Sequence, residues 1–198
     1  MLDKLFNKKP VDAAQSGYSQ RTSGNSGSAS ADLAAELLTA PTALMQLTKE
    51  EAAVIVSYMK PRKISEGTTF IKEGEKVDTG YMVLILDGEV TVENIVVSRI
   101  SPVTVTVLGA GSLIGEMGLV DGAPRSASCT ATTDIRCAVL TRSSLQELME
   151  EEPKIGGKFM MAVSLRIAER LRDVSDKLKL YAQLTQAMQQ EIDKLMPT

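Results

Sequence analysis

The sequence contains no histidine and no tryptophan, and its only cysteines are Cys129 and Cys137. The absence of histidine excludes Ser-His-Asp catalysis, an imidazole general base and the commonest zinc ligand. Both cysteines fall in runs of β-type residues, which favours small buried thiols in a reducing compartment, with a disulfide as the alternative. We expect no metal site.

Long apolar runs are missing as well. No stretch approaches the roughly 18 apolar residues of a membrane-spanning helix, and the N-terminus has no apolar signal core. These absences predict a cytoplasmic protein without a transmembrane segment. The 198 residues, 43% of them hydrophobic, suffice for one domain with a core plus appendages. A formal net charge of −3 gives no general support for nucleic-acid binding.

The first 31 residues differ in composition from the rest. Residues 1–10 mix Leu2, Leu5 and Phe6 with lysines, which indicates a frayed terminus or, alternatively, a short amphipathic hook for a membrane or partner. Residues 13–31 are rich in Ser, Gly, Gln and Asn and predict a flexible linker. Ordered structure is expected from Asp32.

Short helices and then strands are predicted for the next hundred residues. Thr48 and Glu51 have the spacing of a capping box, so a helix should follow and stop before Pro61. From Lys63 onward, apolar residues recur with period two between glycine-containing turns, which predicts an antiparallel barrel or sandwich. Asp87-Gly88 predicts a hairpin.

The stretch Gly115–Ala127 lies between two of these β-type runs and carries the chemistry. The carboxylate of Glu116 can accept hydrogen bonds from a sugar hydroxyl, and the planar fork of Arg125 suits a phosphate. A short helix opening at Glu116 would add backbone N–H donors. The pattern indicates a pocket for a small phosphorylated ribose, and the alternative is an exposed loop with an incidental ion pair.

Other chemistries are poorly supported. Gly109-Ala110-Gly111 follows a predicted strand like a dinucleotide fingerprint, but no sustained helix follows it. No Walker sequence and no Gly-x-Ser-x-Gly elbow occurs, and the run of glutamates at 150–152 indicates a solvated face. We expect no enzymatic activity.

The last third of the chain is predicted to be helical. Ser143 and Gln146 indicate a helix start, Gly156-Gly157 a break, and a long helix should begin at about Lys158. Its apolar residues alternate spacings of four and three, which predicts a parallel two-stranded coiled coil joining two copies through residues 160–195. The alternative is a single helix covering the barrel. The seam consists of Ile167, Leu171, Val174, Leu178, Tyr181, Thr185, Met188, Ile192 and Leu195.

The order Gly-Glu-x-Gly-Leu, a short turn and Pro-Arg-Ser-Ala resembles the phosphate-binding cassette of cyclic nucleotide-binding domains, the family of the catabolite activator protein and protein kinase A regulatory subunits. Glu73-Gly74-Glu75, Asp78, Tyr81 and Leu86–Val90 resemble the first half of the same β-roll, although Val77 stands where the family often carries glycine. The resemblance extends from about Leu44 to Leu178. It implies a mainly β fold with flanking α: an antiparallel β-roll (double-stranded β-helix, jelly-roll-like) with N-terminal helices and a long C-terminal dimerisation helix.

The resemblance also implies roles for single residues. Glu116 would hold the ribose 2′-hydroxyl and Arg125 the cyclic phosphate. Gly115 and Met117 would lie against the sugar-phosphate, and Ser126 and Ala127 would complete the phosphate shell. The candidate apolar walls are Val92, Val105 and Leu108, and Ser175 matches a base-contacting serine that the partner subunit contributes.

The predicted function is that of a cyclic nucleotide receptor. Ser126 stands where family members that prefer cGMP tend to carry threonine, which favours cAMP. The seam runs to Leu195 and leaves no room for a helix-turn-helix, so we expect signalling through an unknown effector protein rather than DNA. The expected units are an arm (1–31), a nucleotide-binding β-roll with its helices (32–157) and a coiled-coil helix (158–198). The alternatives are a dimeric scaffold with a degenerate β-roll and a receptor for a cyclic dinucleotide.

Overall fold

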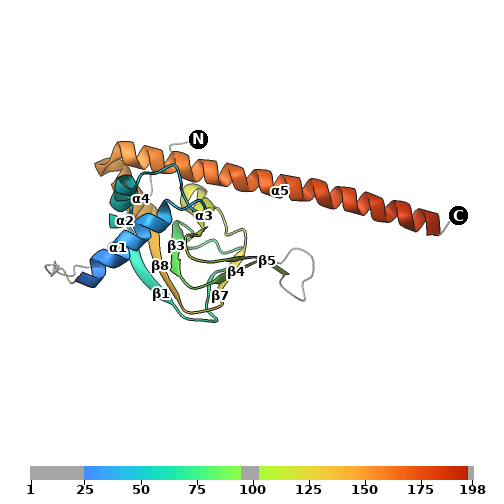
Figure 1. Cartoon of the computed structure of the whole chain (residues 1–198), viewed down its shortest axis with the longest axis horizontal. Coiled ribbons are helices and arrows are strands. Elements are labelled where there is room, and N and C mark those ends of the chain that lie inside the picture. The colour runs from blue at the N-terminus through green and yellow to red at the C-terminus, as the bar shows by residue number, and fades with distance from the viewer. Residues whose placement is uncertain (1–24, 95–102, 196–198) are drawn as a thin grey trace.

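The computed structural model describes residues 25–94 and 103–195, which form two small sheets with helices packed on one side (Figure 1). Two helices come first, α1 (Asn25–Leu38) and α2 (Lys49–Ser57). The strands are β1 (Lys60–Ile64), β2 (Thr69–Ile71), β3 (Tyr81–Asp87), β4 (Val90–Asn94), β5 (Val103–Leu108), β6 (Leu113–Ile114), β7 (Ser128–Ala131) and β8 (Ile135–Thr141). The remaining helices are α3 (Glu116–Asp121), α4 (Arg142–Glu151) and α5 (Pro153–Leu195).

The two sheets are antiparallel throughout and face each other as a roll. Their strand orders are β1-β8-β3-β6 and β2-β7-β4-β5. Apolar side chains from both sheets meet inside, including Val83 and Ile85 of β3, Val92 of β4 and Cys129 of β7. The predicted antiparallel β-roll with flanking helices is confirmed.

Strand β3 shows why this sequence needs helices as well as a roll. Its run of apolar residues is buried on both faces, as a strand covered from both sides requires. Val83 and Ile85 point into the roll, whereas Met82, Leu84 and Leu86 belong to a second core built with the helices. That second core includes Leu38 of α1, Ile55 of α2, Leu148 of α4 and Phe159 of α5. It joins the first and last helices of the chain on one side of the roll.

Two predictions about helix starts can be compared with the structure. The capping box at α2 is confirmed, since the Thr48 hydroxyl accepts from the Glu51 amide at 3.3 Å and the Glu51 carboxylate accepts from the Thr48 amide at 2.8 Å. For α4, the N-cap is Thr141, whose hydroxyl accepts from the Ser144 amide, so the start expected at Ser143 was wrong by two positions.

Three other expectations differ from the structure. Helix α1 begins at Asn25, before the expected onset of order at Asp32. Asp87-Gly88 joins β3 to β4, which lie in different sheets, so it forms a crossover between sheets rather than a hairpin. The predicted break at Gly156-Gly157 is wrong: α5 is continuous from Pro153, with the Gly156 amide donating to the Glu152 carbonyl at 2.8 Å.

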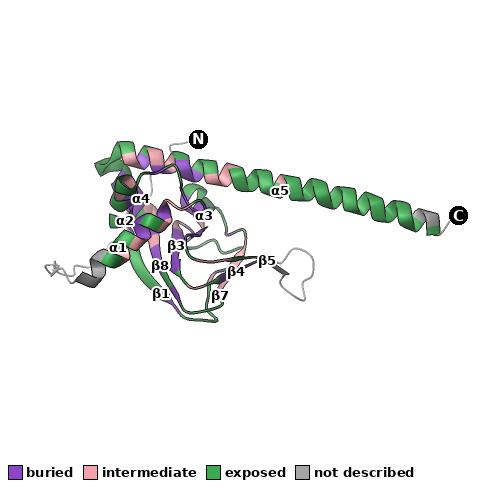
Figure 2. Cartoon of the chain, in the orientation of Figure 1, coloured by how far each residue is buried: buried purple, intermediate pink, exposed green. Residues whose placement is uncertain are grey.

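Helix α5 extends far beyond the β-roll (Figure 1). Its buried residues lie in the N-terminal third, where Phe159, Ala162 and Val163 pack into the helical core (Figure 2). Farther along, the large apolar side chains are exposed, among them Leu171, Leu178, Tyr181 and Met188. Within residues 25–94 and 103–195, no helix is both long and apolar enough to cross a membrane.

Candidate functional site

The cassette, Gly115–Ala127, runs from the end of β6 through α3 to the start of β7. Helix α3 has only six residues, and a glycine in the left-handed region stands at each end, Gly115 with φ 81° and Gly122 with φ 65°. Glycine adopts this backbone without the steric cost that a side chain brings. The two turns hold α3 across the mouth of the roll, with Glu116 as its first residue.

Arg125 is buried inside the cassette with only 6% of its surface exposed. Its guanidinium donates to the Gly115 carbonyl at 3.2 Å and the Tyr81 carbonyl at 3.1 Å, and lies 4.4 Å from the centre of the Tyr81 ring. These contacts fix the fork but use only part of its five N–H donors. A buried, oriented cation with donors to spare is suited to bind an anion.

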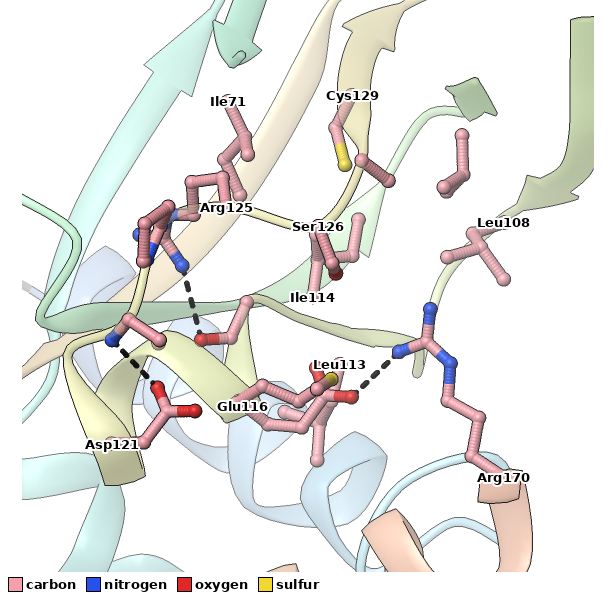
Figure 3. A pocket seen from close by; sticks show the side chains of 17 residues that line it. Ile71, Leu108, Leu113, Ile114, Glu116, Asp121, Arg125, Ser126, Cys129 and Arg170 are labelled. Carbon is pink, nitrogen blue, oxygen red and sulfur yellow. Dashed lines mark hydrogen bonds and ion pairs between the residues drawn. The ribbon is translucent and has the colours of Figure 1, made fainter. Parts of the chain in front are cut away.

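Glu116 is buried as well, with 2% of its surface exposed. Its Oε1 accepts from Nη1 of Arg170 at 2.6 Å, which links the cassette to α5 (Figure 3). The Arg170 side chain is 47% exposed and reaches the carboxylate from the solvent side. The carboxylate therefore has a charged partner that water can also reach.

These groups face one cavity of about 100 Å³ between the cassette, the roll and α5. Eight of the ten predicted site residues line it: Gly115, Glu116, Met117, Arg125, Ser126, Ala127, Val92 and Leu108. Pockets that enclose a small ligand usually measure about 300–1,000 Å³. The cavity, which Arg170 also lines, is smaller than such a pocket.

The other two predicted residues lie elsewhere. Ser175 is half-buried on α5, where its hydroxyl donates to the Leu171 carbonyl at 2.9 Å, and it is not among the described residues that line the cavity. Val105 lies in β5, and its side chain is outside the part of the chain that the structure describes.

Sequence reasoning missed several residues of the site. Arg170 is the most important, because it supplies the charge partner of Glu116. Nothing in its local pattern separates it from the other charged residues of α5. Only the packing of that helix against the cassette identifies it. Ile71, Leu113, Ile114 and Cys129 complete the apolar lining.

The walls of the cavity are weakly polar. Burial raises the pKa of the Cys129 thiol to about 11, so this thiol is neutral at physiological pH and acts as an apolar surface. Burial also raises the pKa of Tyr81, whose hydroxyl donates to the Phe70 carbonyl at 2.8 Å. The cavity thus combines apolar walls with a buried guanidinium and a buried carboxylate.

Comparison with known proteins gives a consistent result. Residues 61–152 match the model of the cyclic nucleotide-binding domain. The chain is similar to a crystal structure of a cyclic nucleotide-binding domain from Methylobacillus flagellatus, with 30% identity, a TM-score of 0.65 and coverage of 76% of this chain and 83% of that one.

Two curated proteins illustrate the range of relatives. A cyclic nucleotide-gated potassium channel of Rhizobium etli is 32% identical over 120 residues, which cover 61% of this chain and 31% of the channel. A CRP-like cAMP-activated global transcriptional regulator of Mycobacterium tuberculosis is 25% identical over 140 residues, or 69% of this chain and 56% of the regulator. The chain thus spans between 31% and 56% of the length of these relatives.

Proposed function

The chain belongs to the cyclic nucleotide-binding domain family, and on this basis we propose that it is a receptor for one cyclic nucleotide, with cAMP preferred over cGMP. One observation carries the proposal. A guanidinium and a carboxylate, each less than a tenth exposed, face the same cavity at the cassette. Burying charged groups is unfavourable; Arg125 is held by neutral carbonyl oxygens and Glu116 is paired with a half-exposed arginine, so a scaffold would gain little from keeping both there.

Different residues of the site bind different parts of the nucleotide. Arg125 pairs with the cyclic phosphate, with the Ser126 hydroxyl and the Ala127 amide completing its shell. Glu116 accepts from the ribose 2′-hydroxyl, and Gly115 and Met117 lie against the sugar-phosphate. Val92, Leu108 and Val105 form apolar walls, and the serine at position 126 supports cAMP.

Arg170 adds a step to binding. In this structure it is bonded to the carboxylate that would hold the ribose, at 2.6 Å. A nucleotide must therefore share this carboxylate with Arg170 or displace the guanidinium toward solvent. Because Arg170 is a residue of α5, nucleotide binding in the pocket directly changes a contact of the long helix.

We further propose that two copies pair in parallel through residues 160–195. The support is the exposed apolar seam of α5, in which Leu171, Leu178 and Met188 are each more than 60% exposed. Such a stripe is characteristic of a coiled-coil partner surface. Ser175 does not line the cavity of its own chain, in keeping with a serine that reaches the nucleotide of the partner subunit.

The receptor signals in the cytoplasm through an effector protein that binds the coil or the arm. Both cysteines are free thiols, as a reducing compartment would keep them. The acidic composition, with a predicted pI near 5.2, offers no electrostatic support for DNA as the partner. The division into arm (1–31), nucleotide-binding unit (32–157) and coil (158–198) stays part of this proposal.

Calorimetric titration with cAMP, cGMP and cyclic di-GMP tests the receptor function. We expect micromolar or tighter binding of cAMP, weaker binding of cGMP, and a loss of about 10- to 150-fold in affinity for Arg125→Ala, because one charge-assisted hydrogen bond contributes about 1.5–3 kcal/mol. Arg136→Ala, which removes an exposed arginine paired with Asp87 at 3.4 Å, is the matched control.

Thermal unfolding of each variant establishes that it is folded before titration. If folded protein, stripped of carried-over ligand, takes up none of the three nucleotides, the receptor proposal fails and the scaffold alternative stands. Preferential binding of cyclic di-GMP would support the cyclic dinucleotide alternative instead.

A further inference from the structure

Helix α3 is too short to be stable alone, since isolated helices of fewer than about 12 residues are marginal in water. It is instead held between two guanidinium groups. Arg125 donates to the carbonyl of Gly115 just before its first turn. The second group comes from Arg142, the first residue of α4, at the other end.

Arg142 binds two carbonyls of the last turns of α3, of which that of Gly118 also accepts from the Gly122 amide at 3.0 Å. Its Nε donates to the Leu119 carbonyl at 3.1 Å, and its Nη2 donates to the Leu119 carbonyl at 2.9 Å and the Gly118 carbonyl at 3.1 Å. A cation at this position also opposes the partial negative charge of a helix C-terminus. The contact is therefore both a cap and an electrostatic clamp.

Two glycines shape the space that this guanidinium occupies. A Cβ at Gly122 would lie 2.8 Å from Nη1 of Arg142, and a Cβ at Gly80 would lie 3.3 Å from the Cβ of Arg142. The Arg142 amide donates to the Gly80 carbonyl at 2.7 Å, which fixes the base of the side chain. The backbone on both sides is thus fitted to an arginine.

Arg142 does not line the nucleotide cavity, so it cannot touch a ligand there. Its backbone instead opens α4, whose Leu145 and Leu148 share the helical core with Phe159 of α5. Arg142 thus links the cassette helix, through its side chain, to α4, and α4 packs against α5.

We propose that Arg142 is the positioning residue of the cassette. It sets where α3 lies, and it couples nucleotide binding at the cassette to α4 and α5. The inference rests on the proposed nucleotide binding. It assigns a role in that binding to a residue that does not itself contact the ligand. A substitution at Arg142 should therefore weaken binding and also uncouple the helices from the ligand.

The test compares Arg142→Met, Arg142→Lys and the control Arg136→Met by calorimetry and hydrogen exchange. We expect Arg142→Met to bind cAMP at least tenfold more weakly, and Arg142→Lys, which keeps a cation with its N–H donors on a single nitrogen, to recover part of the loss. At saturating cAMP, wild type and Arg136→Met should show slowed exchange in residues 142–170. Arg142→Met should not.

Exchange of residues 116–122 without nucleotide provides a readout independent of binding. Here Arg142→Met should exchange faster than wild type, and Arg142→Lys should be intermediate. If folded Arg142→Met keeps wild-type affinity and wild-type exchange, the inference is overturned while the receptor proposal stands. If wild type binds no nucleotide, the receptor proposal fails, and exchange in α3 still decides whether Arg142 holds that helix. If Arg142→Met does not fold, the affinity of Arg142→Lys for cAMP tests the inference instead. An affinity equal to that of wild type would contradict the inference.

Discussion

Glycines and arginines depend on one another in the cassette. A Cβ at Gly115 would lie 2.7 Å from Nη1 of Arg125, and one at Gly118 would lie 2.6 Å from the same atom. The sequence predicts that these glycines let backbone approach something closely. The structure shows that the close neighbour is Arg125 of the same chain, so the glycines leave the space that the guanidinium occupies.

The Glu116–Arg170 contact can be weighed by a double-mutant cycle. Arg170→Ala leaves a carboxylate that is 2% exposed without its cation, and an unsatisfied buried group costs about 1–3 kcal/mol. We expect the lower half of that range in chemical denaturation, because the arginine is itself half-exposed and water can replace it. Glu116→Gln in the Arg170→Ala background should remove most of the loss.

The control for this cycle lies one turn away on the same helix. Arg166 pairs with Glu169 at 3.6 Å and both side chains are partly exposed, at 37% and 49%, so Arg166→Ala leaves no buried charge behind and should change stability by less than about 0.5 kcal/mol. Equal losses for the two arginines would mean that Glu116 does not depend on Arg170.

The buried thiols predict a dependence of stability on alkaline pH. Burial raises the pKa of Cys129 to about 11, from the ordinary thiol value of 9.0. The folded state holds the thiol proton more tightly than the unfolded state, so this contribution is complete below pH 9 and is lost between pH 9 and 11. By pH 10 the loss is about 1 kcal/mol. Because lysines and tyrosines titrate here too, the quantity to measure is the difference in unfolding free energy between wild type and Cys129→Val. A difference that stays constant from pH 8 to pH 10 would contradict the prediction.

At the level of helices and strands, local patterns predicted the elements well, but not where packing overrides them. The capping box of α2 and the period-two strands depend on neighbouring residues, and both were correct. Gly156-Gly157 has the composition of a break, yet Gly156 is buried against α4 and continues the helix. Arg170 was not identified for a related reason. Its role arises from a residue 54 positions earlier in the chain.

The two adjacent glycines of α5 give a matched pair of substitutions. A Cβ at Gly156 would lie 3.0 Å from both Cα and Cγ of Met149, whereas a Cβ at Gly157 meets nothing within 4 Å. Gly156→Ala should therefore force α4 and α5 apart and lower stability by about 1–3 kcal/mol. Gly157→Ala should raise stability by about 0.5–1 kcal/mol, because alanine is the better helix former. Thermal unfolding of both variants measures the contrast. Equal shifts of the same sign would show that the α4–α5 contact does not require Gly156.

At the level of the whole molecule, the chain is a compact roll with helices and one long helix that leaves it (Figure 2). The roll was predictable because alternation and turn residues repeat along the chain, and the cassette because its residues are contiguous. The packing of α5 against the roll was not predictable from the sequence. The same apolar periodicity is found in a helix that covers a domain and in a helix that pairs with another copy. The first third of α5 packs against the helical core, and the large apolar side chains of the remainder are exposed.

That exposed remainder yields a prediction with an internal control. Leu178 lies on the predicted seam and Leu180 lies off it, although the two leucines are 62% and 53% exposed on the same helix. If the proposed dimer forms through this seam, Leu178→Asp should be a monomer in sedimentation equilibrium, because a carboxylate would be buried between the helices. Leu180→Asp should remain dimeric. The monomer should also lose helical circular dichroism, because few tertiary contacts hold α5 beyond Arg170 and helical stability in proteins comes mainly from packing. If Leu180→Asp dissociates and Leu178→Asp does not, the seam lies on the other face of α5, and the proposal that Ser175 reaches the nucleotide of a partner subunit fails.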